Sequence, residues 1–185
     1  MYIALAIVGG LGVILVIWLV VMYNGLVRKR NETKGSFSQI DVQLKRRHDL
    51  IPNLVETVKG YASHESETLE NVIKARNQAI NASGVGNQIS AENELTGALS
   101  RLMVVVEQYP DLRANQNFLS LQEELTSTEN KLGFARQNFN DSVMQYNTSI
   151  ELFPANVVAG MCGFRAEEYW EIEDRSERDT PKVQF

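Results

Sequence analysis

The chain divides into an uncharged apolar stretch and a longer region in which apolar residues recur at three- and four-residue steps. No charged side chain occurs from Met1 to Tyr23. As a helix rising 1.5 Å per residue, this stretch would span roughly 34 Å, enough to cross a hydrocarbon core of about 30 Å. A cleavable signal peptide would need a basic residue before the apolar run and a small-residue cleavage site after it, and neither occurs. We therefore interpret residues 1–23 as an uncleaved transmembrane anchor.

Beyond the anchor, the apolar pattern predicts four helices. The first continues from the anchor to about residue 61 and carries a stripe of Phe37, Ile40, Leu44, Ile51, Leu54, Val58 and Tyr61. Pro52 is expected to bend this helix or to open one backbone hydrogen bond. The second helix is expected from Ser63 or Ser66 to about residue 82, with Ile80 facing inward. The third is expected over about residues 90–109, with Glu92 in its first turn, and the fourth over about residues 117–152. A turn is expected at 84–87, and stops are expected at Pro110 and Pro154. No window alternates with the two-residue period of a strand.

These elements predict an all-α fold, in which the N-terminal transmembrane helix continues into an antiparallel, coiled-coil-like four-helix bundle. The first and fourth helices would each span roughly 55 Å, about twice the length of the second and third. We therefore expect two long helices to form a stalk with the shorter pair packed on its distal half. The expected division is a transmembrane anchor (1–23), a basic juxtamembrane stalk (24–35), the helical bundle (36–153), a C-terminal aromatic segment near the membrane base (154–173) and a disordered tail (174–185).

The distribution of charge predicts the orientation of the chain in the membrane, and the net charge limits the classes of partner. The basic residues that follow the span are Arg28, Lys29, Arg30 and Lys34. The positive-inside rule then places the body in the cytoplasm and the N-terminus outside. The same cluster could bind anionic lipid headgroups, or it could serve only as a topology signal. The formal net charge of -5 argues against a nucleic-acid binder, which usually carries a basic excess.

Two groups of residues are candidates for self-association. In the span, a smooth face suited to helix packing is formed by Ala6, Gly9, Gly10 and Gly12, although such residues also occur in spans without a partner. Near the C-terminus, the candidate oligomer contacts are Phe164, Tyr169, Trp170 and Ile172. This aromatic segment could lie at the lipid interface, but nearby glutamates would be repelled by anionic lipid, so protein contact is favoured.

Two arginines, Arg47 and Arg76, lie on apolar stripes, where an unpaired charge would be costly. Asn140 and Asn147 flank the stripe of the fourth predicted helix and are candidate partners. The four residues could line a polar binding pocket inside the bundle. We favour a hydrogen-bond network that fixes helix register, as buried polar residues do in coiled coils.

No grouping with the spacing of a catalytic or metal site stands out. The two histidines lack the His-x-x-x-His or Glu-x-x-His spacing that converges on a metal. The single cysteine, Cys162, is expected in a loop without an adjacent base, and it cannot form an internal disulfide. We therefore predict no catalytic, cofactor-binding or metal-binding residues and no cofactor, and we expect a protein that is not an enzyme.

One segment resembles a known family. The run from Gln39 to Val55, centred on Leu50, Ile51, Pro52, Asn53 and Leu54, is similar to the LemA family of bacterial membrane proteins, as are Phe139-Asn140, Phe153-Pro154 and Gly163-Phe164. The resemblance implies a single-span protein with a short external N-terminus and a helical cytoplasmic body. It also implies no established catalytic activity or cofactor. Relatives in magnetosome-forming bacteria are linked to membrane shaping, and others are encoded beside membrane peptidases.

Two functions are therefore expected. The first is a membrane-anchored, non-enzymatic helical scaffold that self-assembles at the bacterial cytoplasmic membrane and organises or shapes it, with the lipid bilayer and further copies of the chain as partners. The alternative is a monomeric membrane-tethered adaptor for a membrane protease or signalling protein. In that case the exposed surface around Asn53, Glu56 and Lys59 would matter more than the membrane base.

Overall fold

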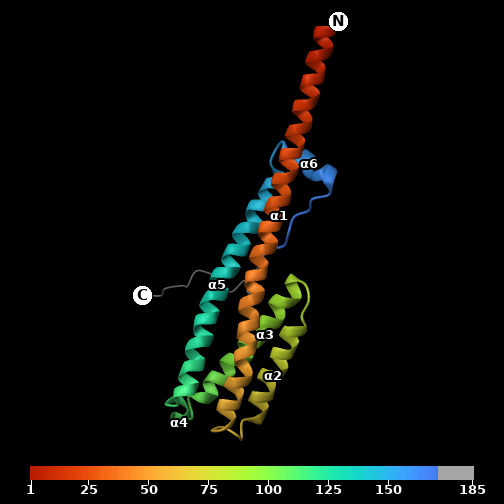
Figure 1. The fold of residues 1–185 in the computed structure, drawn as a ribbon. Coiled ribbons are helices and arrows are strands. Elements are labelled where there is room, and N and C mark those ends of the chain that lie inside the picture. The colour runs from red at the N-terminus through yellow and green to blue at the C-terminus, as the bar shows by residue number, and fades with distance from the viewer. Residues whose placement is uncertain (171–185) are drawn as a thin grey trace, which may run out of the picture. The chain divides into compact units, whose positions relative to one another are not determined.

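The computed structural model describes residues 1–170, apart from the side chains of residues 4–6, and its regular structure in this range is entirely helical. The helices, shown in Figure 1, are α1 (Tyr2–Lys59), α2 (Ser66–Asn81), α3 (Val85–Val106), α4 (Pro110–Arg113), α5 (Gln116–Glu151) and α6 (Ala155–Cys162). The all-helical prediction is confirmed for this part of the chain. The predicted disordered tail and Ile172 lie outside the described residues, as does the side chain of Ala6.

The chain forms two compact units. The first, called the anchor unit here, contains residues 1–40 and 134–169. The second, called the body unit, contains residues 41–133 and Trp170. Helices α1 and α5 each contribute one part to each unit.

Helix α1 is continuous over 58 residues, so the prediction that the apolar segment runs unbroken into the body is confirmed. Pro52 lies inside the helix without ending it. Its ring removes one backbone hydrogen bond, but the neighbouring Ile51 and Leu54 are fully buried, and this packing offsets the loss. The part of α1 before Leu19 is exposed throughout its described side chains.

In the anchor unit, α1 lies against the C-terminal part of α5. Ser36 Oγ is 2.9 Å from Ser142 Oγ, and the Phe37 and Phe139 rings meet edge to face at a centroid distance of 5.4 Å. The chain therefore runs in opposite directions in α1 and in this part of α5, as in an antiparallel helix pair. The side chains buried along this part of the chain are Leu26, Ile40, Ala135, Phe139, Val143 and Tyr146.

In the body unit, five helices contribute to one apolar core. Helices α2 and α3 pack along each other (Figure 1). The fully buried members of the core include Ile51, Leu54 and Val58 of α1, Val72 of α2, Leu95 and Leu102 of α3, and Leu112 of α4. Phe118 of α5 also belongs to it. Tyr61 and Ile80, which the stripe predicted to point inward, are instead exposed.

Four predictions about helix positions differ from the structure. Helix α3 begins at Val85, not at Ser90, because the chain turns at Gly84, whose positive φ of 84° favours glycine. Pro110 starts the short helix α4, where the fixed φ of proline is tolerated in the first turn. Cys162, expected in a loop, is the last residue of α6. Helix α5 begins at Gln116, one residue before the predicted start. The Asn115 side chain caps this end, because its Oδ1 accepts hydrogen bonds from the backbone N–H groups of Asn117 and Phe118.

Candidate functional site

A buried ion cluster lies in the body unit between α1 and α3. Arg47 and Glu92 are only 4% and 1% exposed, and Arg47 Nη1 donates to Glu92 Oε2 at 3.1 Å. The other Glu92 oxygen, Oε1, is 2.7 Å from His48 Nε2. Arg47 Nη2 donates to Thr96 Oγ1 at 2.7 Å, and Arg47 Nε is 3.6 Å from Glu129 Oε2. Both carboxylate oxygens of Glu92 and all three guanidinium nitrogens of Arg47 are therefore engaged within the chain.

The sequence pattern placed Arg47 correctly on the inner stripe but gave no role to Glu92. Glu92 was expected in the first turn of its helix, where a carboxylate favours the helix dipole. Because α3 begins at Val85, Glu92 instead lies two turns into the helix, on its buried side. Extending the Leu95-Leu99-Leu102 spacing backward by three residues reaches Glu92, and this was the available signal.

Three members of the predicted network of Arg47, Arg76, Asn140 and Asn147 have other partners: Arg47 bonds Glu92 and Thr96, and Arg76 and Asn147 bond backbone atoms. Arg76 Nε donates to the backbone carbonyl of His48 at 2.7 Å. Asn147 instead holds the backbone of Glu167, donating to its carbonyl at 3.0 Å and accepting from its N–H at 2.9 Å. The error has a physical reason: a stripe identifies which residues face inward, but not which helix lies opposite.

The contact between Asn147 and Glu167 belongs to a second polar arrangement, which fixes the segment after α6 to α5. Beside it, Tyr146 Oη donates to the backbone carbonyl of Arg165 at 2.9 Å. Burial raises the pKa of Tyr146, and the nearby Glu167 carboxylate adds to this effect. The neutral phenol is therefore the form that the fold stabilises.

The same segment returns to α1. The Phe164 ring meets Tyr23 edge to face at 5.7 Å, and the Arg30 guanidinium lies 5.2 Å from the Phe164 ring centroid. Of the other basic residues that follow the span, Arg28 and Lys34 are exposed and Lys29 is half-buried. The candidate oligomer contacts differ in exposure. Phe164 is half-buried because of its contacts with Tyr23 and Arg30, Trp170 is buried, and Tyr169 is 38% exposed.

The small residues of the span have free space around them. In the part of the chain that the structure describes, no atom lies within 4 Å of a Cβ built at Gly9, Gly10 or Gly12. By length and composition, α1 is the one helix among the described residues that could cross a membrane, and its apolar window, with a mean hydropathy of 2.3, has no part buried in the protein.

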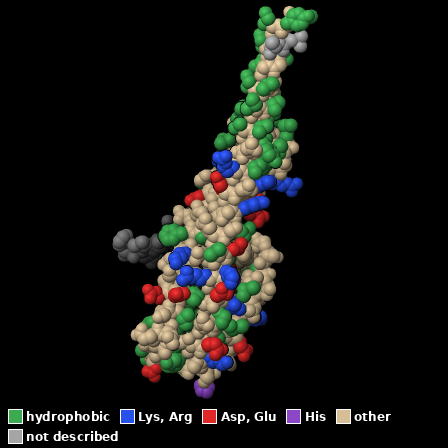
Figure 2. All heavy atoms as spheres, viewed as in Figure 1, with side chains coloured by type: hydrophobic (Ala, Val, Ile, Leu, Met, Phe, Trp, Pro, Cys, Tyr) green, Lys and Arg blue, Asp and Glu red, His purple; other side chains and the backbone are tan. Residues whose placement is uncertain are grey.

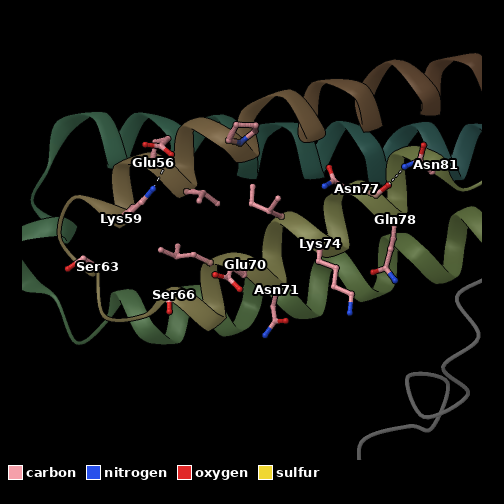
Figure 3. Close-up of a pocket in the computed structure, with 14 residues that line it drawn as sticks. Glu56, Lys59, Ser63, Ser66, Glu70, Asn71, Lys74, Asn77, Gln78 and Asn81 are labelled. Carbon is pink, nitrogen blue, oxygen red and sulfur yellow. Dashed lines mark hydrogen bonds and ion pairs between the residues drawn. The ribbon is translucent and has the colours of Figure 1, made fainter.

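A groove with a volume of about 1030 Å³ runs between the end of α1 and α2 in the body unit (Figure 3). Pro52 and Val55 line its α1 side, together with Glu56 and Lys59, whose charged groups are 4.0 Å apart. The α2 side carries Ser66, Glu70, Lys74 and Asn77 among others. The five residues from Leu50 to Leu54, at the centre of the family-like run, therefore have different surroundings. Ile51 and Leu54 lie in the core, Leu50 is half-buried, Pro52 lines the groove and Asn53 is exposed.

Among the described residues, no group of three or more histidine, cysteine or acidic side chains could hold a metal ion. Cys162 is an exposed free thiol, and its neighbours in sequence, Met161 and Gly163, carry no proton acceptor on their side chains. The ion cluster has its charges paired internally. Its contacts join α1 to α3 and α5.

Taken together, these features define an all-helical protein with a helix of membrane-spanning length and polar clusters that join its helices. A family model for the LemA family matches residues 36–185, and this chain belongs to that family. The resemblance noted in the sequence is confirmed.

Curated relatives are similar over most of the chain. Magnetosome protein MamQ 2 of Paramagnetospirillum magneticum is 26% identical over 191 residues, covering 89% of this chain and 70% of the relative. Magnetosome protein MamQ of Magnetospirillum gryphiswaldense is 25% identical with the same coverage. Protein LemA of Metamycoplasma hominis is 27% identical over 137 residues, covering 74% of this chain and 63% of the relative. These relatives and the apolar helix indicate a membrane-associated protein.

Proposed function

We propose that this chain is a non-enzymatic helical scaffold that self-assembles at the bacterial cytoplasmic membrane and organises or shapes it. In this proposal α1 crosses the bilayer with its N-terminus outside, and the body lies in the cytoplasm. The helices of residues 36–153 would form an antiparallel four-helix bundle. The two similar proteins named as magnetosome proteins support a role at a membrane.

The continuity of α1 carries this proposal. One helix extends from the exposed apolar segment into the core of the body unit, where Ile51, Leu54 and Val58 are fully buried. A body that shares a helix with its anchor is held to the membrane without a flexible linker. Such a helical connection is suited to a protein that works at the bilayer.

The chemistry of the buried cluster supports a role without catalysis. A catalytic carboxylate or base needs a free position directed at a substrate. Glu92 uses both oxygens, on Arg47 and His48, and lies in the protein interior. The cluster is therefore suited to holding helices in register.

The span offers a direct test of self-assembly. Replacing Gly9, Gly10 and Gly12 together with leucine should reduce the mass of the full-length protein in mild detergent, measured by light scattering with the detergent contribution removed. These leucines meet open space within the chain, so a change in mass must come from contacts between chains. The matched control replaces Ile7 with leucine, because at about 100° per residue it lies on the side of the helix away from the mean direction of the three glycines. A wild-type monomer, or an unchanged mass in the glycine variant, would contradict self-assembly through the span.

The groove of the body unit favours the second candidate, an adaptor for a membrane protease or signalling protein. Its open side combines apolar residues with the charged pair of Glu56 and Lys59. If the wild type stays monomeric across detergents, crosslinking should capture a foreign protein in stoichiometric amount. Exchanging the charges by Glu56→Lys and Lys59→Glu would then reduce that capture, whereas the scaffold predicts no effect of this exchange on assembly mass.

A further inference from the structure

Helix α6 is apolar on two opposite sides. On one side, Val158 and Ala159 are buried against Leu26 of α1, with Leu19 and Met22 packed beside them. On the other side, Val157 and Met161 lie one helical turn apart and are 53% and 80% exposed, and Phe153, in the turn that precedes α6, is 82% exposed. Asn156 is the one polar side chain of α6, and a helix with this much apolar surface is typical of a protein interior or a membrane. Among residues 1–170, none covers this outer side of α6.

The position of α6 indicates what covers this side. Leu19 and Met22, which it contacts, belong to the end of the uncharged run of α1. No charged side chain occurs between Glu151 and Arg165, so the whole of α6 is uncharged. In Figure 2, hydrophobic side chains cover the N-terminal part of α1 and the region around α6, and the first Lys and Arg side chains follow next to them.

The residues beside α6 are those expected at the edge of a bilayer. The rings of Tyr23 and Phe164 meet there, and Arg30 lies over the Phe164 ring. Aromatic rings favour the depth of the headgroups, and cations next to them pair with lipid phosphates. Gly163 ends α6 in the left-handed conformation, at a φ of 72°, and directs the chain toward the Phe164 contact.

We propose that α6 and the preceding turn form an in-plane membrane element. Phe153, Val157 and Met161 insert among the acyl chains of the leaflet on the body side, next to the end of the α1 span. The inference rests on the proposed membrane anchoring by α1. The occupant is lipid, because the outer side of α6 continues an apolar surface that the bilayer already covers and bears no charged group with which a protein partner could pair.

This arrangement gives the anchor a second point of attachment. A single span can tilt and rotate about its axis, and these angles are set by neighbouring elements and interfacial anchors. Because α6 packs on α1 and would also lie in the leaflet, it fixes the direction in which the anchor unit faces along the membrane.

Depth-dependent quenching tests the inference on the full chain. In a Cys162→Ser background, single cysteines replace Val157 or Met161, are labelled with a nitrobenzoxadiazole fluorophore, and are reconstituted in phosphatidylcholine–phosphatidylglycerol vesicles. Lipids bearing a nitroxide near the headgroup end of the acyl chain should remove most of the emission at both positions, and aqueous iodide should have little effect. Gln137→Cys, at an exposed position of α5, is the matched control and should respond to iodide alone.

A label at Val13→Cys separates this inference from the anchoring on which it rests. Quenching at position 13 by nitroxides deep in the acyl chains, together with iodide quenching at 157 and 161, would overturn the inference and leave the anchor intact. Iodide quenching at position 13 would overturn the anchoring, and the inference with it. Protection of 157 and 161 from both quenchers would show a protein contact at α6 and would also overturn the proposed lipid contact.

Discussion

Removing Glu92 should destabilise the body unit more than removing any exposed charge. In the variant Glu92→Met, the Arg47 guanidinium stays buried and keeps Thr96 and the more distant Glu129 as partners. Breaking a buried ion pair on one side costs about 3–5 kcal/mol, because the remaining charge is uncompensated in the interior. His48 Nε2 loses its partner as well. Because Glu129 still lies 3.6 Å from Arg47 Nε and compensates part of its charge, we expect a loss near the lower end of this range.

The double variant Arg47→Met, Glu92→Met distinguishes a charge effect from a packing effect. Replacing both partners of a buried pair by apolar side chains of similar size is often neutral or stabilising. His48 Nε2 then lacks the partner that Glu92 supplied, which costs about 1–3 kcal/mol. The double variant should therefore be more stable than Glu92→Met alone.

Urea unfolding of the full chain in nonionic detergent, followed by circular dichroism at the helical band, measures these differences. Arg46 and Glu124 are the matched control, because this pair lies 3.6 Å apart with both side chains about half exposed. Glu124→Met should cost no more than about 1 kcal/mol. A loss below about 1 kcal/mol for Glu92→Met, or a double variant as unstable as the sum of the two single variants, would refute the reasoning.

Two further predictions concern the anchor unit. Because burial raises the pKa of Tyr146 above its ordinary value of 10.0, the stability it contributes is fully present below that pH and is lost as pH rises through the folded-state pKa. Tyr146→Phe should cost about 1 kcal/mol at neutral pH and flatten this alkaline loss in urea titrations, and an unchanged alkaline loss would contradict the assignment. Gly163→Ala should destabilise by about 1–2 kcal/mol through backbone strain alone, since its Cβ would meet no atom within 4 Å. Its control Gly35→Ala, at an exposed helical position, should be stabilising by thermal unfolding, and equal effects of the two changes would argue against strain.

The helices of this protein were predictable because their signals are local. The uncharged run before Asn24 and the three- and four-residue steps after it determine an all-helical chain with one span-length helix. The proline at position 52 did not break α1, because helix interiors tolerate one lost hydrogen bond when the neighbouring residues are packed. Local signals were least reliable at short elements: α4 and α6 were both missed, since the periodic pattern needs more turns than these helices contain.

The sequence by itself thus determined the elements, the charge distribution that follows the span and the inward position of Arg47. Only the tertiary structure decided the partners. Glu92 became the partner of Arg47 through the start of α3, which depends on the positive φ of Gly84. The turn at Gly163 places α6 against the end of the apolar run of α1. It also directs the following segment back to α5, where Asn147 bonds the backbone of Glu167. The physical reason is that periodicity records which side of a helix is buried, whereas the identity of the opposing residue depends on helix register and turn geometry, which involve residues distant in the chain.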